Sequence, residues 1–409
     1  MSGGRVRGGQ GAPALEPAGL TTRKQQLLAA VDGLLEEGFA LAQAMAEHPE
    51  LSLREYETSR LQRAFLESRG FSIRPGPGGL ETAYVADRAG QAAAPRVALL
   101  AEMDALPEIG HACGHNLSGP ASLVAAVALA AHHPAEELHV RVVGCPAEEI
   151  GVGKRRLVEA GVFEGVDAAM MAHASDMRRA HRLFLGNHKF EAVFRGRASH
   201  AAAYPELGRN ALDGVVAFYV SVGLLRQQLP REVRVHVIVS DGGRAPNVIP
   251  ERAAARVWVR ALQREVLRET VERVQACARG AAEATETELD IEVDPSSSPP
   301  LRPCLPLAEL YARQLAFLGL PESGHGPEEH IGSSDITHVS QVVPTIHPNF
   351  PIGRDLKLHT RAFADAARGP RAREGLAEAA RALALTAQEL ALVPEERRHV
   401  RRAFEQAEG

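Results

Sequence analysis

The sequence predicts an α/β fold: a doubly wound, mostly parallel sheet that is interrupted by an inserted ferredoxin-like α+β domain. Two observations lead to this prediction. Apolar strand-like runs alternate with helical patterns in the first half of the chain, an order typical of a parallel sheet with helices on both faces. From about residue 187 the order becomes β-α-β-β-α-β, the split ferredoxin-like pattern. At 409 residues the chain is also long enough for more than one domain.

The first region supplies the elements of the parallel sheet. Apolar spacing or Ala- and Val-rich composition predicts helices over residues 21–47, 55–68, 116–133 and 154–160. Short apolar runs predict strands over residues 82–86, 96–100, 138–144 and 166–172. Polar groups follow three of these strands directly. We therefore expect them to gather at the carboxyl edge of the sheet, where sites of such folds lie.

The inserted domain is predicted to occupy residues 187–294. Its expected elements are a strand over 188–195, a helix over 210–228, strands over 234–240 and 253–260, a helix over 264–284 and a strand over 288–293. Asn210 is a candidate cap for its first helix. The larger domain then comprises 21–186 and 295–409, with helices over 305–318 and 371–392, and residues 1–20 form a flexible tail.

Composition limits the possible partners and compartment. The formal net charge of −5 gives no basic footprint for nucleic acid, and no apolar run reaches the length that spans a membrane. The N-terminus lacks the apolar core of a signal peptide. Four cysteines show no disulfide framework, which favours a reducing compartment and a cytoplasmic location.

The stretch Ala101 to Asn116, A-E-M-D-A-L-P-E-I-G-H-A-C-G-H-N, concentrates metal-binding side-chain types. Cys113 and His115 flank Gly114, so both can point at one centre from a tight loop. Carboxylate, imidazole and thiolate are the donors that an ion such as Zn²⁺ selects. The competing interpretation is a turn with a buried cysteine and Asn116 as helix cap.

Further candidates follow the later strands. Glu148 and Glu149 come directly after the strand over 138–144, and adjacent residues of an extended chain point opposite ways. One carboxylate can thus bind a metal while the other faces a water. His173 follows the strand over 166–172, and His359 is the last candidate. An exposed acidic pair and ordinary polar histidines are the alternatives. We assign no role to His181, His188, His325, His330, His338 and His347.

The inserted domain carries two specific segments. R-G-R-A-S-H-A-A-A-Y-P contains Ser199 and His200, and G-G-R-A-P-N-V-I-P presents Asn247. Turn chemistry explains most of these residues. A turn does not need His200, however, so we favour a functional role for that side chain.

These motifs together resemble peptidase family M20, the aminoacylase and metallocarboxypeptidase superfamily. The Cys-Gly-His form resembles its amidohydrolase branch, and the His-Asn ending is similar to the group of p-aminobenzoyl-glutamate hydrolase and Xaa-Arg (β-alanyl-lysine) dipeptidase. The resemblance implies a dimetal domain with an inserted lid that dimerises. It implies the metal ligands Cys113, His115, Glu149, His173 and His359. It also implies Glu148 as general base and acid, Asp104 behind a ligand histidine, and His200 and Asn247 on the substrate carbonyl or carboxylate.

The expected activity is metal-dependent hydrolysis of an amide bond in a dipeptide or an N-acyl amino acid. Two divalent ions would activate a water for Glu148 to deprotonate. Thiolate and imidazole favour zinc, and the carboxylates permit manganese. We expect a homodimer in which His200 acts in the partner's site. The alternatives are an enzyme that cleaves or forms an amide in specialised metabolism, and a metal-binding scaffold without catalysis.

Overall fold

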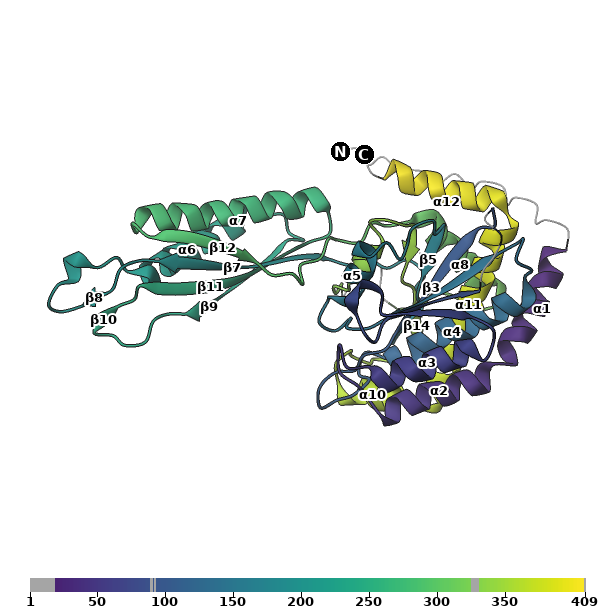
Figure 1. Cartoon of the computed structure of the whole chain (residues 1–409). Helices are drawn as coiled ribbons and strands as arrows, with labels where there is room; N and C mark the ends of the chain where they lie inside the picture. Colours follow the sequence, from purple (N-terminus) through teal and green to yellow (C-terminus); the bar gives the residue numbers. More distant parts are fainter. Residues whose placement is uncertain (1–18, 89–90, 92, 325–330, 408–409) are drawn as a thin grey trace.

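The computed structural model describes residues 19–88, 91, 93–324 and 331–407 (Figure 1). Residues 1–18 of the expected tail, together with His325 and His330, lie outside this part of the chain. Leu20 already belongs to the first helix.

The larger domain is built on a six-stranded sheet. Its order is β1 (Ser72–Pro75), β2 (Tyr84–Arg88), β4 (His139–Cys145), β3 (Arg96–Glu102), β5 (Ala168–Met170) and β13 (Thr345–Ile346). The last four strands run parallel, while β1 and β2 form an antiparallel edge. This confirms the mostly parallel sheet that the sequence predicts.

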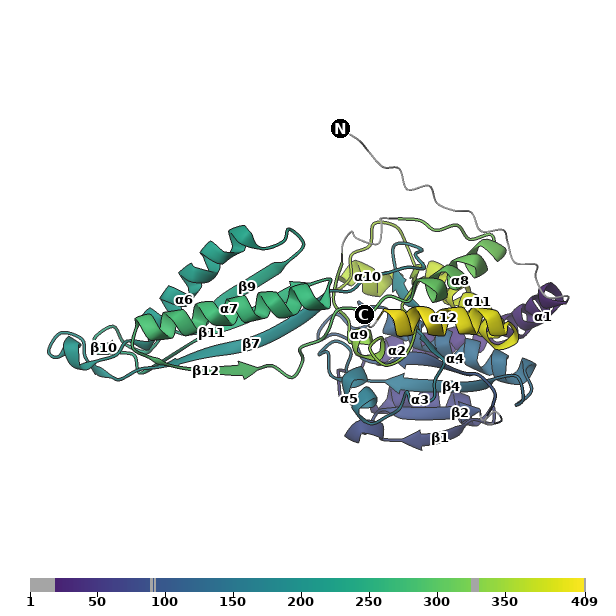
Figure 2. The ribbon, with the colours of Figure 1, turned by 90° about the horizontal axis from the view of Figure 1, so that it is seen from above.

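Helices cover both faces of this sheet (Figures 1 and 2). They are α1 (Leu20–Asp32), α2 (Leu35–Glu47), α3 (Tyr56–Glu67), α4 (His115–His132), α5 (Gly153–Glu159), α8 (Leu305–Phe317), α9 (Ile336–Val339), α10 (Arg361–Ala366), α11 (Pro370–Leu392) and α12 (Pro394–Gln406). Helix α4 is buried over most of its length, because its Ala- and Val-rich surface packs between β3, β4 and the helices α2 and α11. It delivers the Cys-Gly-His motif to the edge of the sheet.

Two local expectations were wrong. The helix expected over 21–47 is interrupted at Gly33, where a residue of low helix propensity permits the chain to turn between α1 and α2. The strand expected over 166–172 ends at Met170. The chain then moves to a second ladder, in which β6 (His173–Ser175) pairs in parallel with β14 (Asn349–Pro351). His173 therefore begins a strand rather than following one.

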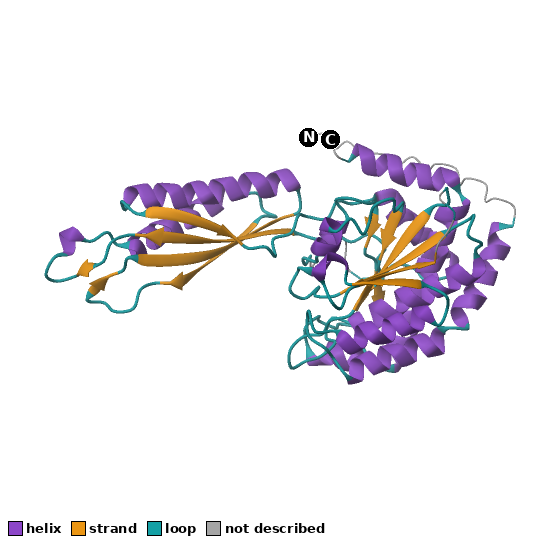
Figure 3. Ribbon diagram, in the orientation of Figure 1, coloured by secondary structure: helices purple, strands orange, loops and turns teal. Residues whose placement is uncertain are grey.

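The inserted domain, called the lid below, is a four-stranded antiparallel sheet with two helices on one face (Figure 3). Its elements are β7 (Gly186–Arg195), α6 (Ala211–Leu225), β9 (Arg234–Asp241), β11 (Arg252–Ala261), α7 (Arg264–Ala284) and β12 (Glu288–Val293). The sheet order β12-β7-β11-β9 is that of the ferredoxin-like pattern. Asn210 caps α6 as expected, since its side chain accepts a hydrogen bond from Leu212 N.

The lid projects away from the larger domain, and a small two-stranded ladder lies at its far end (Figure 1). This ladder consists of β8 (Ser199–His200) and β10 (Val248–Ile249). No helix within the described residues is long and apolar enough to cross a membrane.

Candidate metal and substrate site

A cavity of about 490 Å³ lies between the carboxyl edge of the larger sheet and the base of the lid. Its wall contains several of the expected site residues, namely Cys113, Glu148, Glu149, His173 and His359. These residues come from four separate segments of the chain. The fold thus brings together side chains that lie up to 246 residues apart.

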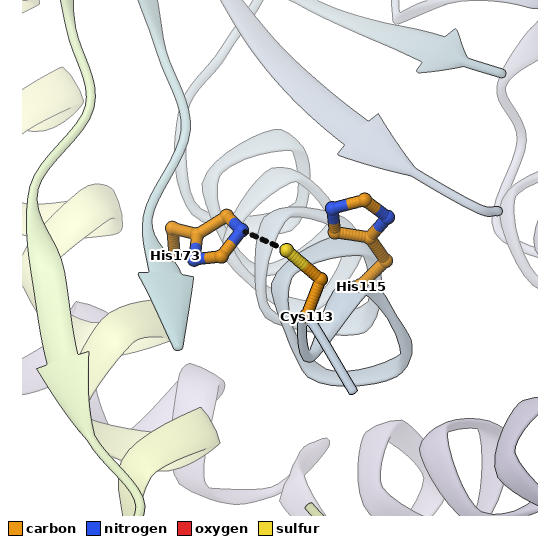
Figure 4. A group of neighbouring side chains, drawn as sticks. All are labelled: Cys113, His115 and His173. Atoms are coloured by element: carbon orange, nitrogen blue, oxygen red, sulfur yellow. Dashed lines mark hydrogen bonds between the residues drawn. The ribbon is translucent and has the colours of Figure 1, made fainter. Parts of the chain in front are cut away.

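Gly114 allows the Cys-Gly-His turn to pack against β6. It has a φ of +81° at the N-cap of α4, and a Cβ there would lie 2.5 Å from the Cβ of Ala174. Cys113 therefore precedes the helix and His115 opens it, and Figure 4 shows the two side chains next to each other and to His173.

The described side chains form four overlapping groups that could hold a metal ion. Cys113 belongs to two of them, one with His115 and His173 and one with Glu149 and His359. Cys113 Sγ lies 3.7 Å from His173 Nε2 and 3.6 Å from His359 Nε2, and His359 Nε2 lies 3.6 Å from Glu149 Oε2. Figure 4 shows the thiol directed at His173, with the ring of His115 beside it. Such separations suit donors that share one ion, because zinc binds sulfur at about 2.3 Å and nitrogen at about 2.0–2.1 Å.

Hydrogen bonds orient the two buried histidines toward this centre. His115 Nδ1 lies 2.8 Å from the backbone oxygen of Asp104 and 3.2 Å from its Oδ1, and His173 Nδ1 lies 2.8 Å from the backbone oxygen of Ala174. Each Nδ1–H can therefore donate to oxygen, which leaves Nε2 as a lone-pair donor. His115 Nε2 is buried and makes no hydrogen bond within the described part of the chain. A bound metal ion would give this nitrogen a partner.

Two buried carboxylates hold the loop that carries the glutamate pair. Ala147, with a φ of +60°, donates its N–H to Glu55 Oε1 at 2.9 Å, and Glu149 donates its N–H to Asp104 Oδ2 at 3.0 Å. The two glutamate side chains then diverge. Glu149 joins Cys113 and His359, whereas Glu148 lies on the side of His115. Glu55 was not predicted from the sequence, because it holds the loop only through a hydrogen bond with Ala147, which lies 92 residues away in the chain.

Burial and neighbouring charges act on the protonation of the cluster in different directions. Desolvation, with Glu102 and Asp335 nearby, raises the pKa of Glu148, and burial also raises the pKa of the Cys113 thiol. Burial lowers the pKa of His173 to about 4. His173 is thus held neutral, as a metal ligand must be. The donor set fits a divalent ion.

Three charged residues beside the ligand cluster were not anticipated, and one of them, Glu102, lies 3.4 Å from His115 Nε2 through its Oε2. Lys154 Nζ lies 2.7 Å from Glu102 Oε1 and 2.5 Å from Asp335 Oδ1, and no side chain of this triad is exposed. Glu102 stands in the motif stretch, but nothing in the sequence connects it with Lys154 or Asp335.

His347 was assigned no role, and the structure places it in the cavity wall. Its ring centroid lies 5.2 Å from that of His173, and neither ring nitrogen has a hydrogen-bond partner among the described residues. His347 follows β13 directly, at the kind of strand end where site residues were sought. It was not found because β13 has only two residues, too few for the sequence to show a strand pattern.

His200 and Asn247 do not reach the cavity of their own chain. His200 is exposed in β8 at the far end of the lid, and the N–H of Ala201 donates to the backbone oxygen of Asn247. Figure 1 shows the separation between this ladder and the larger domain. The two residues are therefore neighbours of each other, but not of the ligand cluster.

Comparison with known proteins agrees with this architecture. A family model described as a peptidase dimerisation domain matches residues 185–286. Xaa-Arg dipeptidase of Mus musculus is 36% identical over 405 residues, covering 95% of this chain and 93% of its own. One of the subunits of p-aminobenzoyl-glutamate hydrolase from Escherichia coli is 34% identical over 303 residues, covering 69% of this chain and 62% of its own.

Solved structures share the fold. A Bacillus subtilis protein described as a dinuclear metal binding peptidase superposes with a TM-score of 0.69 at 24% identity, covering 88% of this chain and 99% of that one. A Staphylococcus aureus protein superposes with a TM-score of 0.77 at 19% identity, covering 90% of this chain and 99% of that one.

The fold and the relatives together define a hydrolase of the peptidase class, and the edge of its larger sheet carries groups of side chains that could hold a metal ion. Relatives that match over at least 90% of their own length and are named as a dipeptidase support amide hydrolysis as its chemistry. The chain belongs to the M20 peptidase family, which confirms the resemblance drawn from the motifs.

Proposed function

We propose that the protein is a metal-dependent hydrolase that cleaves the amide bond of a dipeptide or an N-acyl amino acid. The observation that carries this proposal is the convergence of Cys113, His173, Glu149 and His359 in one cavity, with Glu148 beside them. The names of the relatives, a dipeptidase and a p-aminobenzoyl-glutamate hydrolase, motivate the substrate class.

The metal would be held by Cys113, His115, Glu149, His173 and His359. Cys113 belongs to two of the four candidate ligand groups, which supports two neighbouring ions. Bound divalent ions would polarise the scissile carbonyl and make a water acidic enough to lose a proton near neutral pH. Thiolate and imidazole donors favour zinc, and the carboxylate donors also permit manganese. Asp104 would orient His115 through its contact with Nδ1.

Glu148 would act as the general base. Its carboxylate diverges from Glu149 and lies on the His115 side of the cluster, 3.9 Å from His115 Nε2, at the cavity wall. Burial raises its pKa, which brings the carboxyl closer to the range in which a group can both take and return a proton. It would accept a proton from the attacking water and pass it to the leaving amine.

His200 would donate a hydrogen bond to the developing oxyanion in the partner's site. Its Nδ1 accepts the backbone N–H groups of Ala202 and Ala203 at 3.2 and 3.1 Å. The proton of the neutral ring is therefore on Nε2, which remains a free donor at the exposed tip of the lid. Asn247, which lies next to the His200 segment, would bind the substrate carbonyl or carboxylate.

The lid offers a surface through which two chains could pair. Helix α6 exposes Val216, Tyr219, Val220 and Leu224 beside the unpaired edge of β9. An apolar helix face next to an open sheet edge is typical of an interface. A homodimer through this surface would bring one lid tip toward the other chain. A cytoplasmic location stays a prediction from the cysteines, all four of which are free.

The test is a substrate panel with a catalytically disabled control. The purified chain, loaded with Zn²⁺ or Mn²⁺, is incubated with dipeptides and N-acyl amino acids, and the free amine is measured. We expect turnover by the parent protein and a rate about 10²–10⁴-fold lower in Glu148→Gln. If the metal-loaded parent protein releases no amine from any substrate of the panel, a metal-binding scaffold without catalysis is favoured instead.

A further inference from the structure

The cavity contains an arginine that the proposed hydrolysis does not use. Arg182 is 8% exposed and lines the cavity, and its Nε has no hydrogen-bond partner among the described residues. Its one side-chain hydrogen bond within that part of the chain runs from Nη1 to Met177 Sδ at 3.7 Å. Asp176 acts on Arg182 only through its charge, with no ion pair between them among the described residues, and burial still lowers the pKa of the guanidinium. A buried guanidinium that no carboxylate contacts is costly, because its desolvation is offset only in part.

Two further cations lie on the lid side of the same cavity. Lys189 of β7 and Arg260 of β11 line it, and neither forms an ion pair with a carboxylate in the part of the chain that the structure describes. Lys189 Nζ donates to Ser296 Oγ at 2.8 Å, and Arg260 Nε is buried without a partner among the same residues. Both cations flank the ring of Trp258, at 4.9 and 5.4 Å from its centroid.

The acids of the cavity do not neutralise these three cations. Glu148 and Glu149 belong to the ligand cluster, and Asp335 is paired with Lys154. Asp294 acts on Lys189 only through its charge, and it accepts its hydrogen bonds from Ser296. The lid side of the cavity therefore has an excess of positive charge that an anionic ligand would balance.

This positive region adjoins the ligand cluster. Phe184 packs edge-on against His347 with 4.8 Å between ring centroids, and His347 contacts His173. Arg182 precedes Phe184 by two residues and contributes to the low pKa of His347. A ligand that spans from the metal centre to Arg182 thus remains within one cavity.

We propose that Arg182, with Lys189 and Arg260, forms an anion subsite that binds the side-chain carboxylate of an acidic residue in the substrate. The proposal rests on the proposed function for the position of the scissile amide. A guanidinium recognises a carboxylate through two parallel N–H···O bonds, and a water-poor site strengthens them. More than one unpaired cation suits a ligand with two carboxylates, such as an N-acyl-glutamate.

The subsite also predicts what the protein rejects. A basic side chain would place like charges together beside the buried Arg182, which costs binding energy. The relative from Mus musculus is named for arginine, and this chain is expected to differ from that preference.

Calorimetric titration of the metal-loaded, full-length Glu148→Gln protein tests the subsite without turnover. The probes are N-acetyl-L-glutamate and N-acetyl-L-glutamine, which have nearly the same shape and differ by one charge. We expect glutamate to bind at least about tenfold more tightly, the effect of one hydrogen-bonded charge pair. Adding Arg182→Gln should remove this preference and leave the Kd for glutamine unchanged, while Arg182→Lys should retain part of it.

Arg195→Gln is the matched control, because it removes the same charge from an exposed position of β7 that is paired with Asp290. It should leave both Kd values unchanged. If Arg182→Gln does not fold, Arg260→Gln and Lys189→Met in the same background carry the test, and each should reduce the preference.

Four outcomes overturn the subsite: equal affinity for the two probes, tighter binding of N-acetyl-L-arginine, no binding of either probe, or equal weakening of both by Arg182→Gln. The hydrolase proposal fails separately. A glutamate preference that depends on Arg182, in a protein whose parent form releases no amine from any substrate, would keep the subsite and reject the hydrolysis.

Discussion

Lys154 and Glu102 form an ion pair of 2.7 Å in which neither side chain is exposed. Asp335 lies on the other side of the same ammonium. The pair connects α5 to the end of β3, where Glu102 also contacts the ligand cluster through His115. Removal of the cation would leave two buried carboxylates together without compensation.

We therefore expect Lys154→Met to lower the free energy of unfolding by about 3–5 kcal/mol, the usual cost of breaking a buried pair. Urea denaturation monitored by circular dichroism measures this change. Arg156→Met is the control, because Arg156 is exposed on the same helix; its effect should stay within about 0.5 kcal/mol. A loss below about 1 kcal/mol in Lys154→Met would contradict a compensated buried pair.

Cys113→Ser and His115→Ala should each lose most of the bound metal and the activity, because each removes a proposed ligand. Metal content by mass spectrometry, measured beside the rate, checks this. Cys277→Ser, which changes a half-buried cysteine on the lid helix α7, should keep both. Full metal content in Cys113→Ser would show that the thiolate is not a ligand.

Glu148→Gln and Glu149→Gln should both lose activity, but for different reasons. Glu148→Gln should retain the metal and lose about 10²–10⁴-fold in rate, the contribution of general acid–base catalysis. Glu149→Gln should lower metal occupancy, because Glu149 joins Cys113 and His359 in one ligand group. Paired metal and rate measurements separate the two. Equal metal loss in both variants would mean that the roles are assigned wrongly.

His200→Ala should reduce the rate strongly with metal content intact, and activity should return in mixed dimers with Glu148→Ala. Each mixed dimer would contain one site with an intact Glu148 from one chain and an intact His200 from the other. Mixing Glu148→Ala with His115→Ala is the control and should restore nothing, because both changes lie in the larger domain. Mixed dimers that are verified but remain inactive would reject action in trans.

The sequence predicts those parts of the site that are local. Cys113, Gly114 and His115 are consecutive, and the two glutamates follow a long apolar strand, so their spacing alone indicates chemistry. The lid was predicted well for a related reason. Its strands and helices are long and periodic, and α7 begins and ends where expected.

Contacts between distant segments could not be predicted in this way. Lys154 lies 52 residues from Glu102 and 181 from Asp335, and each is ordinary in its own segment. Strands β13 and β14 have two and three residues, too few for a period to emerge, so His347 went unassigned. The cation excess around Arg182 likewise exists only where the lid meets the larger domain.

The most direct test of metal-dependent amide hydrolysis is a titration of chelator-stripped protein with Zn²⁺ or Mn²⁺, in which amine release from a substrate is followed at each step. The proposed site predicts no turnover without metal and a rise to a plateau at about two ions per chain. A stripped protein that keeps its full rate would contradict the proposed role of the metal.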